Sequence, residues 1–474
     1  MTGQELSTVA VSAPGKVLLA GGYLVLDRAY SGLVFGLSAR INVVAQEIAT
    51  SEGVHLNEIV VESPQFLEAQ WRYGYHLADQ DGGIKVTQLQ VGSRIVSNPF
   101  VETTLNYALT YIARAGRYKP SHSVKAARLT ILADNDYYSQ PTTTTSTSEP
   151  PSSSSETPPA SSINATRAIA AGRFARFPTT LSGAHKTGLG SSAALVTALT
   201  AALLTHYLDR LLFGLDTDQG RQVLHNLAQA AHCAAQGKVG SGFDVAAAVY
   251  GSSHYRRFSP AILGQLPEAG APGFATQLGR VVDGKEEDGA KWDTEVIKDA
   301  VSLPAGVAMR MCDVDCGSQT VGMVKQVLAW RAREPEAAKE LWDELQRRND
   351  ALAKVLKDGK KDEIRGAIRK VREYVKMMGD KSGTPIEPDS QTELLDALEG
   401  VEGVYGGVVP GAGGFDAVAL LVRDDKESVV RLKEFLEDWS REKGSRITLM
   451  DVKGEMEGVR HETLDHYQGW LREV

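Results

Sequence analysis

The sequence predicts an α+β protein of more than one domain, and three observations support this. The chain has 474 residues, and at ~150 residues per domain this length favours two or three domains. Both ends of the chain alternate apolar and polar residues around Gly and Pro, as strands joined by tight turns do. The helical patterns between these ends do not alternate with strands in a strict βαβ order, which favours α+β over a doubly wound sheet.

The N-terminal half is expected to begin with strands and to continue with helices. Residues 7–47 carry the first alternating pattern and predict strands with tight turns. Apolar residues at helical spacing predict a helix over 99–116. An almost wholly apolar helix is expected over 191–213, and a second helix over 218–236. The most apolar stretch, Ala193–Leu204, is shorter than the ~20 residues of a membrane span and predicts a buried helix.

The C-terminal half is expected to contain a helical hairpin and further strands. Two charged amphipathic helices are predicted over 335–378, each with an apolar stripe, and Asp358-Gly359 forms the turn between them. The remaining predicted elements are strands over 307–313, 404–410, 415–422 and 446–452 and a helix over 427–439.

One internal segment is predicted to be disordered. Residues Ser139–Ser162 include nine Ser, six Thr and five Pro among 24 residues, and Ala160 is the one apolar residue there. Such a segment has nothing to bury that would offset the entropy of ordering it. We interpret it as an insertion in a surface loop.

Composition and charge exclude several classes of protein. The chain is 42% hydrophobic and 23% charged, which is typical of a globular protein. Its net charge of −8 argues against a broad nucleic-acid-binding surface. Three cysteines cannot form a disulfide framework in a chain this long, which fits a reducing compartment. The N-terminus lacks the apolar stretch of a signal peptide, so we expect a cytoplasmic protein with no nucleic-acid or membrane partner.

The most informative stretch is Lys186-Thr-Gly-Leu-Gly-Ser-Ser-Ala-Ala194, directly before the apolar helix. Gly188 and Gly190 allow the backbone to approach a ligand closely, and Ser191 and Ser192 can cap the helix. Free N–H groups at a helix start, together with the positive end of the helix dipole, bind anions. We therefore expect this phosphate loop (residues 186–194) to bind the phosphate chain of a nucleotide.

Three other interpretations of the loop compete with this one. A Walker P-loop needs G-x-x-x-x-G-K-[ST], a string that the sequence does not contain. A dinucleotide-binding turn would use Gly188 to Ala193 with Asp209 as the acidic partner. However, no hydrophobic strand leads into this turn, and Asp209 falls within the helical pattern. An ordinary Gly-Ser helix start would be favoured if the motif stood alone.

Two more glycine-rich turns accompany the phosphate loop. They are Ser12-Ala-Pro-Gly-Lys-Val-Leu-Leu-Ala-Gly-Gly-Tyr-Leu-Val-Leu-Asp27 and Val409-Pro-Gly-Ala-Gly-Gly-Phe-Asp-Ala-Val418. The three motifs in this order resemble the GHMP small-molecule kinases. Within that family, residues 236–251 and Pro385-Ile-Glu-Pro388 look like the fungal-type phosphomevalonate kinases.

The resemblance implies a two-domain α+β GHMP kinase fold. The N-terminal domain, residues 1–262, would be ribosomal-protein-S5-like, bind ATP and carry the insertion at 139–162. The C-terminal domain, residues 263–474, would be ferredoxin-like and carry the helical hairpin at 335–378. The implied activity is transfer of the ATP γ-phosphoryl group to (R)-5-phosphomevalonate, giving (R)-5-diphosphomevalonate in isoprenoid and sterol synthesis. Another GHMP kinase, such as a mevalonate kinase, and a non-catalytic sensor on this fold remain the alternatives.

The resemblance also implies site residues. Lys16 and Asp244 are expected to be catalytic, with Asp244 orienting Lys16 and the acceptor more than acting as a base. Nucleotide binding is expected from Lys186, Thr187, Gly188, Leu189, Gly190, Ser191, Ser192 and Ala193. Substrate binding is expected from Lys16, Tyr23, Lys238, Ser241, Arg256 and the backbone N–H groups of Ala412 and Gly413.

A magnesium ion is expected with ATP. Ser191 and Ser192 are the predicted metal ligands. Many relatives add a Glu about a dozen residues before the catalytic Asp, but that position falls near His232-Cys233, where the sequence has no carboxylate. We therefore name no protein carboxylate for the metal.

Overall fold

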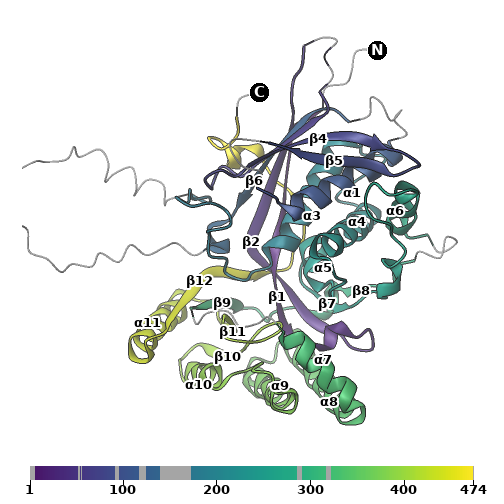
Figure 1. Cartoon of the computed structure of the whole chain (residues 1–474). Coiled ribbons are helices and arrows are strands. Elements are labelled where there is room, and N and C mark those ends of the chain that lie inside the picture. The colour runs from purple at the N-terminus through teal and green to yellow at the C-terminus, as the bar shows by residue number, and fades with distance from the viewer. Residues whose placement is uncertain are drawn as a thin grey trace, which may run out of the picture.

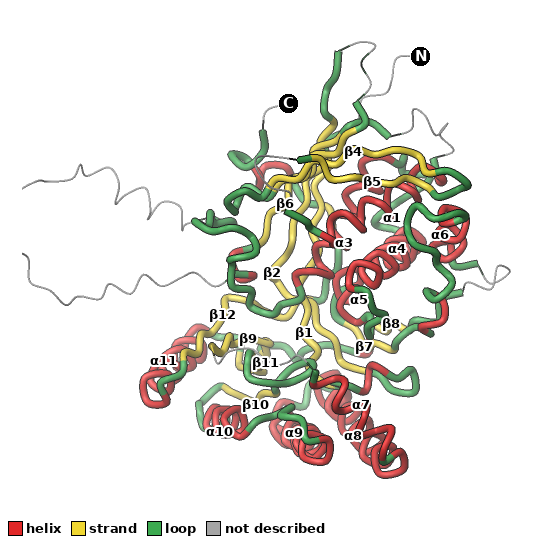
Figure 2. Tube along the Cα trace, in the orientation of Figure 1, coloured by secondary structure: helices red, strands yellow, loops and turns green. Residues whose placement is uncertain are grey.

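The computed structural model describes residues 6–51, 54, 56–90, 96–116, 124–138, 172–285, 291–315 and 322–472. The insertion predicted at 139–162 lies outside these residues. The described part mixes helices with one large sheet, so the predicted α+β class is confirmed (Figures 1 and 2). Two short 3-10 helices, η1 (Leu24–Leu26) and η3 (Asn135–Tyr137), lie near the site described below.

The sheet runs through both halves of the chain in the order β10-β11-β9-β12-β2-β6-β3-β4-β5, and β1, β7, β8 and β13 join it off this path. Its strands are β1 (Val9–Ala20), β2 (Gly32–Glu47), β3 (Glu58–Glu62), β4 (Gln70–Ala78), β5 (Gly83–Leu89), β6 (Ala127–Ala133), β7 (Ser253–Arg256), β8 (Glu295–Ile297), β9 (Val307–Asp315), β10 (Val404–Val408), β11 (Ala417–Arg423), β12 (Arg446–Glu455) and β13 (Arg460–His461). The helices are α1 (Pro99–Ala115), α3 (Ser191–Tyr207), α4 (Asp218–Gln236), α5 (Phe243–Tyr250), α6 (Phe274–Asp283), α7 (Met323–Arg333), α8 (Pro335–Lys357), α9 (Lys361–Ser382), α10 (Asp389–Leu398) and α11 (Lys426–Lys443).

Helix α3 lies at the centre of the N-terminal half. It packs on β1 and β2, and α1, α4 and α5 cover it (Figure 1). Thirteen of its 17 residues are buried, which explains its almost wholly apolar sequence and confirms the predicted buried helix. The helix ends at Tyr207 and not at the predicted residue 213, because the backbone of Leu208 is already extended.

The C-terminal half has the strand–helix order β-α-β-β-α-β. Its four strands β9, β10, β11 and β12 pair antiparallel in the order β10-β11-β9-β12. This connectivity is the ferredoxin-like arrangement, as predicted. Strand β12 also pairs with β2 through Gly454 and Leu37, so the sheets of the two halves are continuous.

Helices α8 and α9 form the predicted hairpin. Their apolar stripes are buried against one another and against α7. The turn falls at Asp358 and Gly359, as expected, and Gly359 adopts the positive φ of +73° that such a turn requires. Helix α9 continues to Ser382, four residues beyond the predicted end.

Helix α6 and strand β8 follow the predicted domain boundary but pack on the N-terminal half. Helix α6 lies against α1 and α4, and β8 pairs with β7. Near the end of the chain, β13 pairs with β1. These contacts join elements on both sides of residue 262, and the domain boundary there stays a prediction.

Candidate active site

Lys16 lies on β1, where the strand meets the phosphate loop. The pairing of β1 with β2 shifts register between Pro14 and Lys16, so the strand is irregular at this point. The backbone N–H of Lys16 donates a hydrogen bond to the carbonyl of Leu189 at 2.9 Å. Its Nζ lies 5.5 Å from the ring centroid of Phe243, the first residue of α5. Lys16 thus connects the loop before α3 with the start of α5.

Two opposing effects act on the pKa of the Lys16 ammonium group. Burial lowers the pKa of Lys16 below the ordinary value of 10.5, and the attraction of the Asp244 carboxylate partly raises it again. Within the described residues, Asp244 is the charged group that acts on this ammonium. The two residues predicted to be catalytic are therefore brought into electrostatic contact.

The phosphate loop ends at the start of α3, where the described residues place no side-chain cap on the first backbone N–H groups. Gly188 and Gly190 have φ values of +73° and +82°, which glycine adopts without strain. Gly190 is the N-cap of α3, and within the described part of the chain no side chain accepts a hydrogen bond at this cap. The predicted serine cap is therefore wrong, since Ser191 and Ser192 lie within the first turn. The uncapped N–H groups are placed to bind an anion.

The other loop residues divide between anchoring and lining. The Thr187 hydroxyl donates to the carbonyl of Asp136 at 2.5 Å, so this side chain anchors the loop. Leu189 and Ala193 are buried and contribute packing and backbone groups. Lys186, Ser191 and Ser192 line a cavity of about 90 Å³, whose walls include the aromatic residues Phe66, Trp71, Phe100 and Tyr138. We call this the aromatic cavity.

Asp244 occupies the first turn of α5, after Gly242 with a φ of +79°. Its Oδ1 accepts a hydrogen bond from the backbone N–H of Val245, and its Oδ2 lies 3.9 Å from Nδ1 of His232. Asp244 lines a second cavity of about 400 Å³. We call this the basic cavity, because Lys238 and Arg257 lie on its wall together with Ser241.

The third glycine turn, residues 411–414, lies against the first one. The N–H of Gly411 donates to the carbonyl of Leu18, and the Tyr23 hydroxyl donates to the carbonyl of Ala412 at 2.5 Å. Tyr23 itself has a φ of +64°, a strained conformation for a residue with a side chain. The N–H of Gly413 donates to the carbonyl of Pro410, so this amide has a partner within the turn, and its binding of substrate stays a prediction.

The Arg256 side chain, assigned to the substrate from the sequence, is paired within the protein, and its role at the substrate stays a prediction. Its guanidinium donates to Glu295 and to the backbone carbonyls of Arg28 and Ala29, and it does not line the basic cavity. The next residue, Arg257, does line that cavity, and its guanidinium is held by carbonyls that include that of Gly240. Neighbouring residues of an extended chain point to opposite sides, and this alternation separates the two arginines.

Oxygen donors for a magnesium ion are present at the start of α3. The described residues contain no group of three or more His, Cys, Asp or Glu side chains that could hold a metal. The Ser191 and Ser192 hydroxyls line the aromatic cavity beside the free helix N–H groups. Magnesium binds oxygen ligands and usually keeps several waters, so a site with few protein ligands fits this ion.

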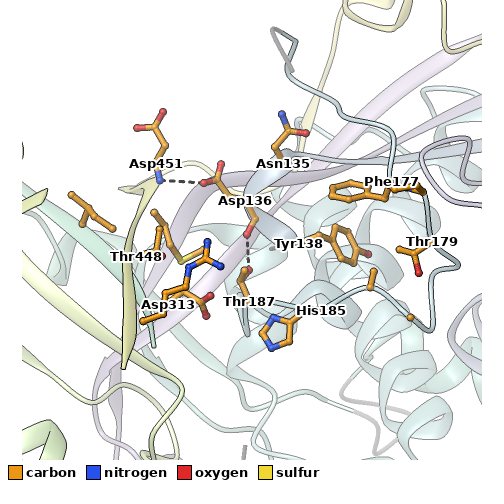
Figure 3. A pocket seen from close by; sticks show the side chains of 16 residues that line it. Asn135, Asp136, Tyr138, Phe177, Thr179, His185, Thr187, Asp313, Thr448 and Asp451 are labelled. Carbon is orange, nitrogen blue, oxygen red and sulfur yellow. Dashed lines mark hydrogen bonds between the residues drawn. The ribbon is translucent and has the colours of Figure 1, made fainter. Parts of the chain in front are cut away.

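A cavity of about 770 Å³ lies behind the phosphate loop, between η3, the segment before the loop, and β9 and β12 (Figure 3). Its polar lining includes Asp136, Asp313, Arg446 and Asp451. Asp136 accepts hydrogen bonds there from the backbone of Asp451 and from Thr187 (Figure 3). Although this cavity is larger than the other two, neither Lys16 nor Asp244 lines it, so it is not the place where those two residues act.

Comparison with known proteins identifies the family. The model of the GHMP kinases N terminal domain matches residues 175–252, which include the phosphate loop and Asp244. The chain is 62% identical to phosphomevalonate kinase ERG8 of Gibberella zeae over 98% of this chain and 99% of that protein. The chain belongs to the phosphomevalonate kinase family. It is also 45% identical to phosphomevalonate kinase erg8 of Aspergillus fumigatus, over 98% and 99% of the two chains.

Solved structures support the same fold for this phosphomevalonate kinase family member. The Streptococcus pneumoniae phosphomevalonate kinase in complex with phosphomevalonate and AMPPNP matches with a TM-score of 0.59 at 16% identity. The match covers 94% of this chain and all of that one. The GHMP kinase fold predicted from the three motifs is therefore confirmed. Among the described residues, none of the helices has both the length and the apolar composition of a membrane span.

Sequence reasoning missed two residues of this kinase site. One is Arg257, because the order of residues does not show whether Arg256 or Arg257 faces the basic cavity. The other is His232, which stands near the position where many relatives have a Glu. The sequence does not indicate its contacts with Ser192 and Asp244.

Proposed function

We propose that the chain transfers the γ-phosphoryl group of ATP to (R)-5-phosphomevalonate, giving ADP and (R)-5-diphosphomevalonate. A phosphate oxygen of the acceptor forms the new bond to the γ-phosphorus, and the bond to the β–γ bridging oxygen breaks. One observation carries the proposal: Lys16 lies between the phosphate loop and Asp244, so one ammonium serves both sides of the reaction.

On the donor side, the aromatic cavity receives the adenine and the phosphate loop receives the phosphates. The cavity offers Phe66, Trp71 and Tyr138 as apolar and stacking surface for a base. The Lys186 side chain and the free N–H groups of α3 lie at the same cavity or beside it. A base and a phosphate chain are thus matched by an apolar pocket that adjoins an anion site.

On the acceptor side, the basic cavity receives phosphomevalonate. The main difficulty of the reaction is repulsion between two phosphates, about 4 kcal/mol per pair of unit charges at 4 Å and an effective dielectric of 20. Lys238 and Arg257 supply positive charge at this cavity, and Ser241 supplies a hydroxyl. Lys16 adds the charge that neutralises the transferred group in the transition state.

Asp244 orients Lys16 and the acceptor. The second pKa of a phosphate monoester is near ~6, so the acceptor is mostly ionised at neutral pH and needs little general-base assistance. Ser191 and Ser192 are the residues that would hold a magnesium ion, which neutralises phosphate charge when it is bound. The reaction therefore depends on positioning: the acceptor is already deprotonated, Asp244 orients Lys16, and the backbone amides of the phosphate loop are fixed.

A coupled assay of ADP release tests the proposal. Phosphomevalonate should support turnover, whereas mevalonate, homoserine and diphosphomevalonate should support little. Equal or better turnover with mevalonate would refute the assignment of the acceptor. Lys16→Met should abolish ADP release while calorimetry still detects ATP binding, because the loop amides are unchanged. Absence of ADP release by the unaltered chain with all four acceptors would favour a non-catalytic sensor.

The division of the chain into domains is part of the proposal. We place the ATP-binding half at residues 1–262 and extend it by the packing of α6 and β8. The C-terminal half then supplies the ferredoxin-like sheet and the 411–414 turn. A cytoplasmic location stays a prediction from the sequence.

A further inference from the structure

His232 lies where four helices meet. It belongs to α4, and its side chain is 3% exposed. The ring of Phe100, from α1, lies 5.8 Å away between centroids. Ser192 approaches from the start of α3, and Asp244 from the start of α5. His232 and Asp244 line the basic cavity, whereas Ser192 lines the aromatic cavity, so the imidazole is part of the wall between the two.

The ring contacts both sides of this wall through different nitrogens. Nε2 lies 3.1 Å from Oγ of Ser192 and 3.1 Å from the side-chain amide nitrogen of Gln236. Nδ1 lies 3.9 Å from Oδ2 of Asp244. A neutral imidazole has one donor nitrogen and one acceptor nitrogen, and the neighbour of one nitrogen decides the state of the other. The carboxylate on the Nδ1 side favours the proton on Nδ1, which leaves Nε2 as the acceptor.

This tautomer determines how the Ser192 hydroxyl points. When Nε2 accepts, any hydrogen bond between the ring and Ser192 is donated by the Ser192 hydroxyl, and the Gln236 amide N–H, also 3.1 Å away, donates to the same nitrogen. Both lone pairs of Oγ are then free for the aromatic cavity and for a cation beside it. With the opposite tautomer, Nε2 would donate to Oγ, occupy one lone pair and release the hydroxyl proton toward the cavity. With that opposite tautomer, the partial positive charge of the Ser192 hydroxyl hydrogen would face the expected cation and repel it.

We propose that His232 is a positioning residue that joins Asp244 to Ser192 and, as the Nδ1–H tautomer, aims the Ser192 oxygen into the nucleotide site. The inference rests on the proposed function, since it assigns Ser192 to the nucleotide and its metal ion. It gives Asp244 a second task, because the same carboxylate faces Lys16 and the imidazole.

Burial alone does not explain the contacts of His232 with Ser192 and Asp244. His225, two helical turns earlier on α4, is equally buried, but its polar contact is with Asn226 of the same helix. Its other neighbours are the rings of Tyr250 and Trp292. His225 therefore provides a matched control, with the same residue type, helix and burial but no contact with the site.

The first test is spectroscopic and does not depend on turnover. Nitrogen-15 NMR of the full chain labelled at histidine, assigned with His232→Gln, reports which ring nitrogen carries the proton. We expect the spectrum to show a proton on Nδ1 of His232 and none on Nε2. A ring protonated at Nε2, or one that exchanges freely between the two forms, would overturn the proposal.

The second test follows the link to Ser192. We expect His232→Phe to weaken binding of Mg²⁺–ATP by about tenfold in calorimetry and to lower kcat by at least as much. His232→Gln should recover most of both losses, because its amide oxygen can accept the Ser192 proton. His225→Phe should leave both quantities unchanged. In a Ser192→Ala background, His232→Phe should add less than a twofold further loss of binding.

Several outcomes would contradict this reasoning. Fully additive losses in the double variant would mean that His232 does not act through Ser192. A His232→Gln variant that melts normally but binds nucleotide no better than His232→Phe would exclude the acceptor role. Failure of the proposed function is recognised separately, because the unaltered chain would then release no ADP with phosphomevalonate whatever tautomer the NMR spectrum shows.

Discussion

Replacing Gly190 by Ala should separate backbone strain from displacement of Lys16. Gly190 has a φ of +82°, so alanine there costs about 1–2 kcal/mol of folding free energy. The added Cβ would also lie 2.7 Å from Cε and 2.8 Å from Cγ of Lys16. Ordinary contact begins at 3.4 Å, so the Lys16 side chain must move by about 0.7 Å or more.

A displacement of this size at a positioned catalytic group costs on the order of 10²-fold in rate. That factor corresponds to about 2.7 kcal/mol of transition-state stabilisation. Gly188→Ala is the matched variant: its φ is +73°, and its added Cβ would meet nothing within 4 Å. Both variants should lose similar unfolding free energy in urea titrations, whereas kcat for ADP release should fall about 10²-fold further in Gly190→Ala. Equal values of kcat in the two variants would refute the view that the Gly190 position controls Lys16.

Three further predictions concern charge, a turn contact and a buried ion pair. In Asp244→Asn, the alkaline limb of kcat/KM should move to lower pH, because burial lowers the pKa of Lys16 and the variant removes the carboxylate that raises this pKa. An alkaline limb at the same pH in the variant would show that Lys16 does not determine the limb. Tyr23→Phe removes the hydrogen bond to the carbonyl of Ala412 and should cost about 0.5–1.5 kcal/mol in unfolding free energy, with kcat/KM lowered several-fold. An unchanged kcat/KM would mean that the 411–414 turn does not depend on this hydrogen bond for catalysis. Arg372→Leu leaves Glu387 buried without its partner and should lower the unfolding free energy by about 3–5 kcal/mol in urea titrations, whereas Arg441→Ala, at an exposed ion pair, should leave the urea midpoint unchanged. Similar losses of unfolding free energy in both variants would contradict the argument from burial.

Elements with clear end signals could be predicted from the sequence. Helix α4 has the predicted bounds because the Thr217 side chain caps its start and Gly237, with a φ of +66°, ends it. Strand β3 was not predicted, because Glu58 and Glu62 are buried in it and look like exposed polar residues in the sequence. Their partners, Arg72 and Arg128, lie on other strands, so the pairing exists only after folding.

In the candidate site, too, some residues can be predicted from the sequence and others cannot. Lys16, the phosphate loop and Asp244 stand in glycine-rich motifs whose chemistry is readable locally. The choice between Arg256 and Arg257 depends on the direction of β7 and its neighbours. The role proposed for His232 depends on contacts with Phe100, 132 positions earlier in the chain, and with Ser192, 40 positions earlier. Such relations arise from tertiary packing and leave no local pattern.

The continuity of the sheet from β12 into β2 limits how the molecule can move. Opening the two halves as separate bodies would break main-chain hydrogen bonds at Gly454 and Glu455, and the bond from the Arg40 guanidinium to Glu455 with them. Entry of two anionic substrates must then rely on local rearrangement of the turns around Lys16. A kinase built in this way is expected to show small changes in overall dimensions on ligand binding, and its adaptation should be concentrated in a few glycine peptides.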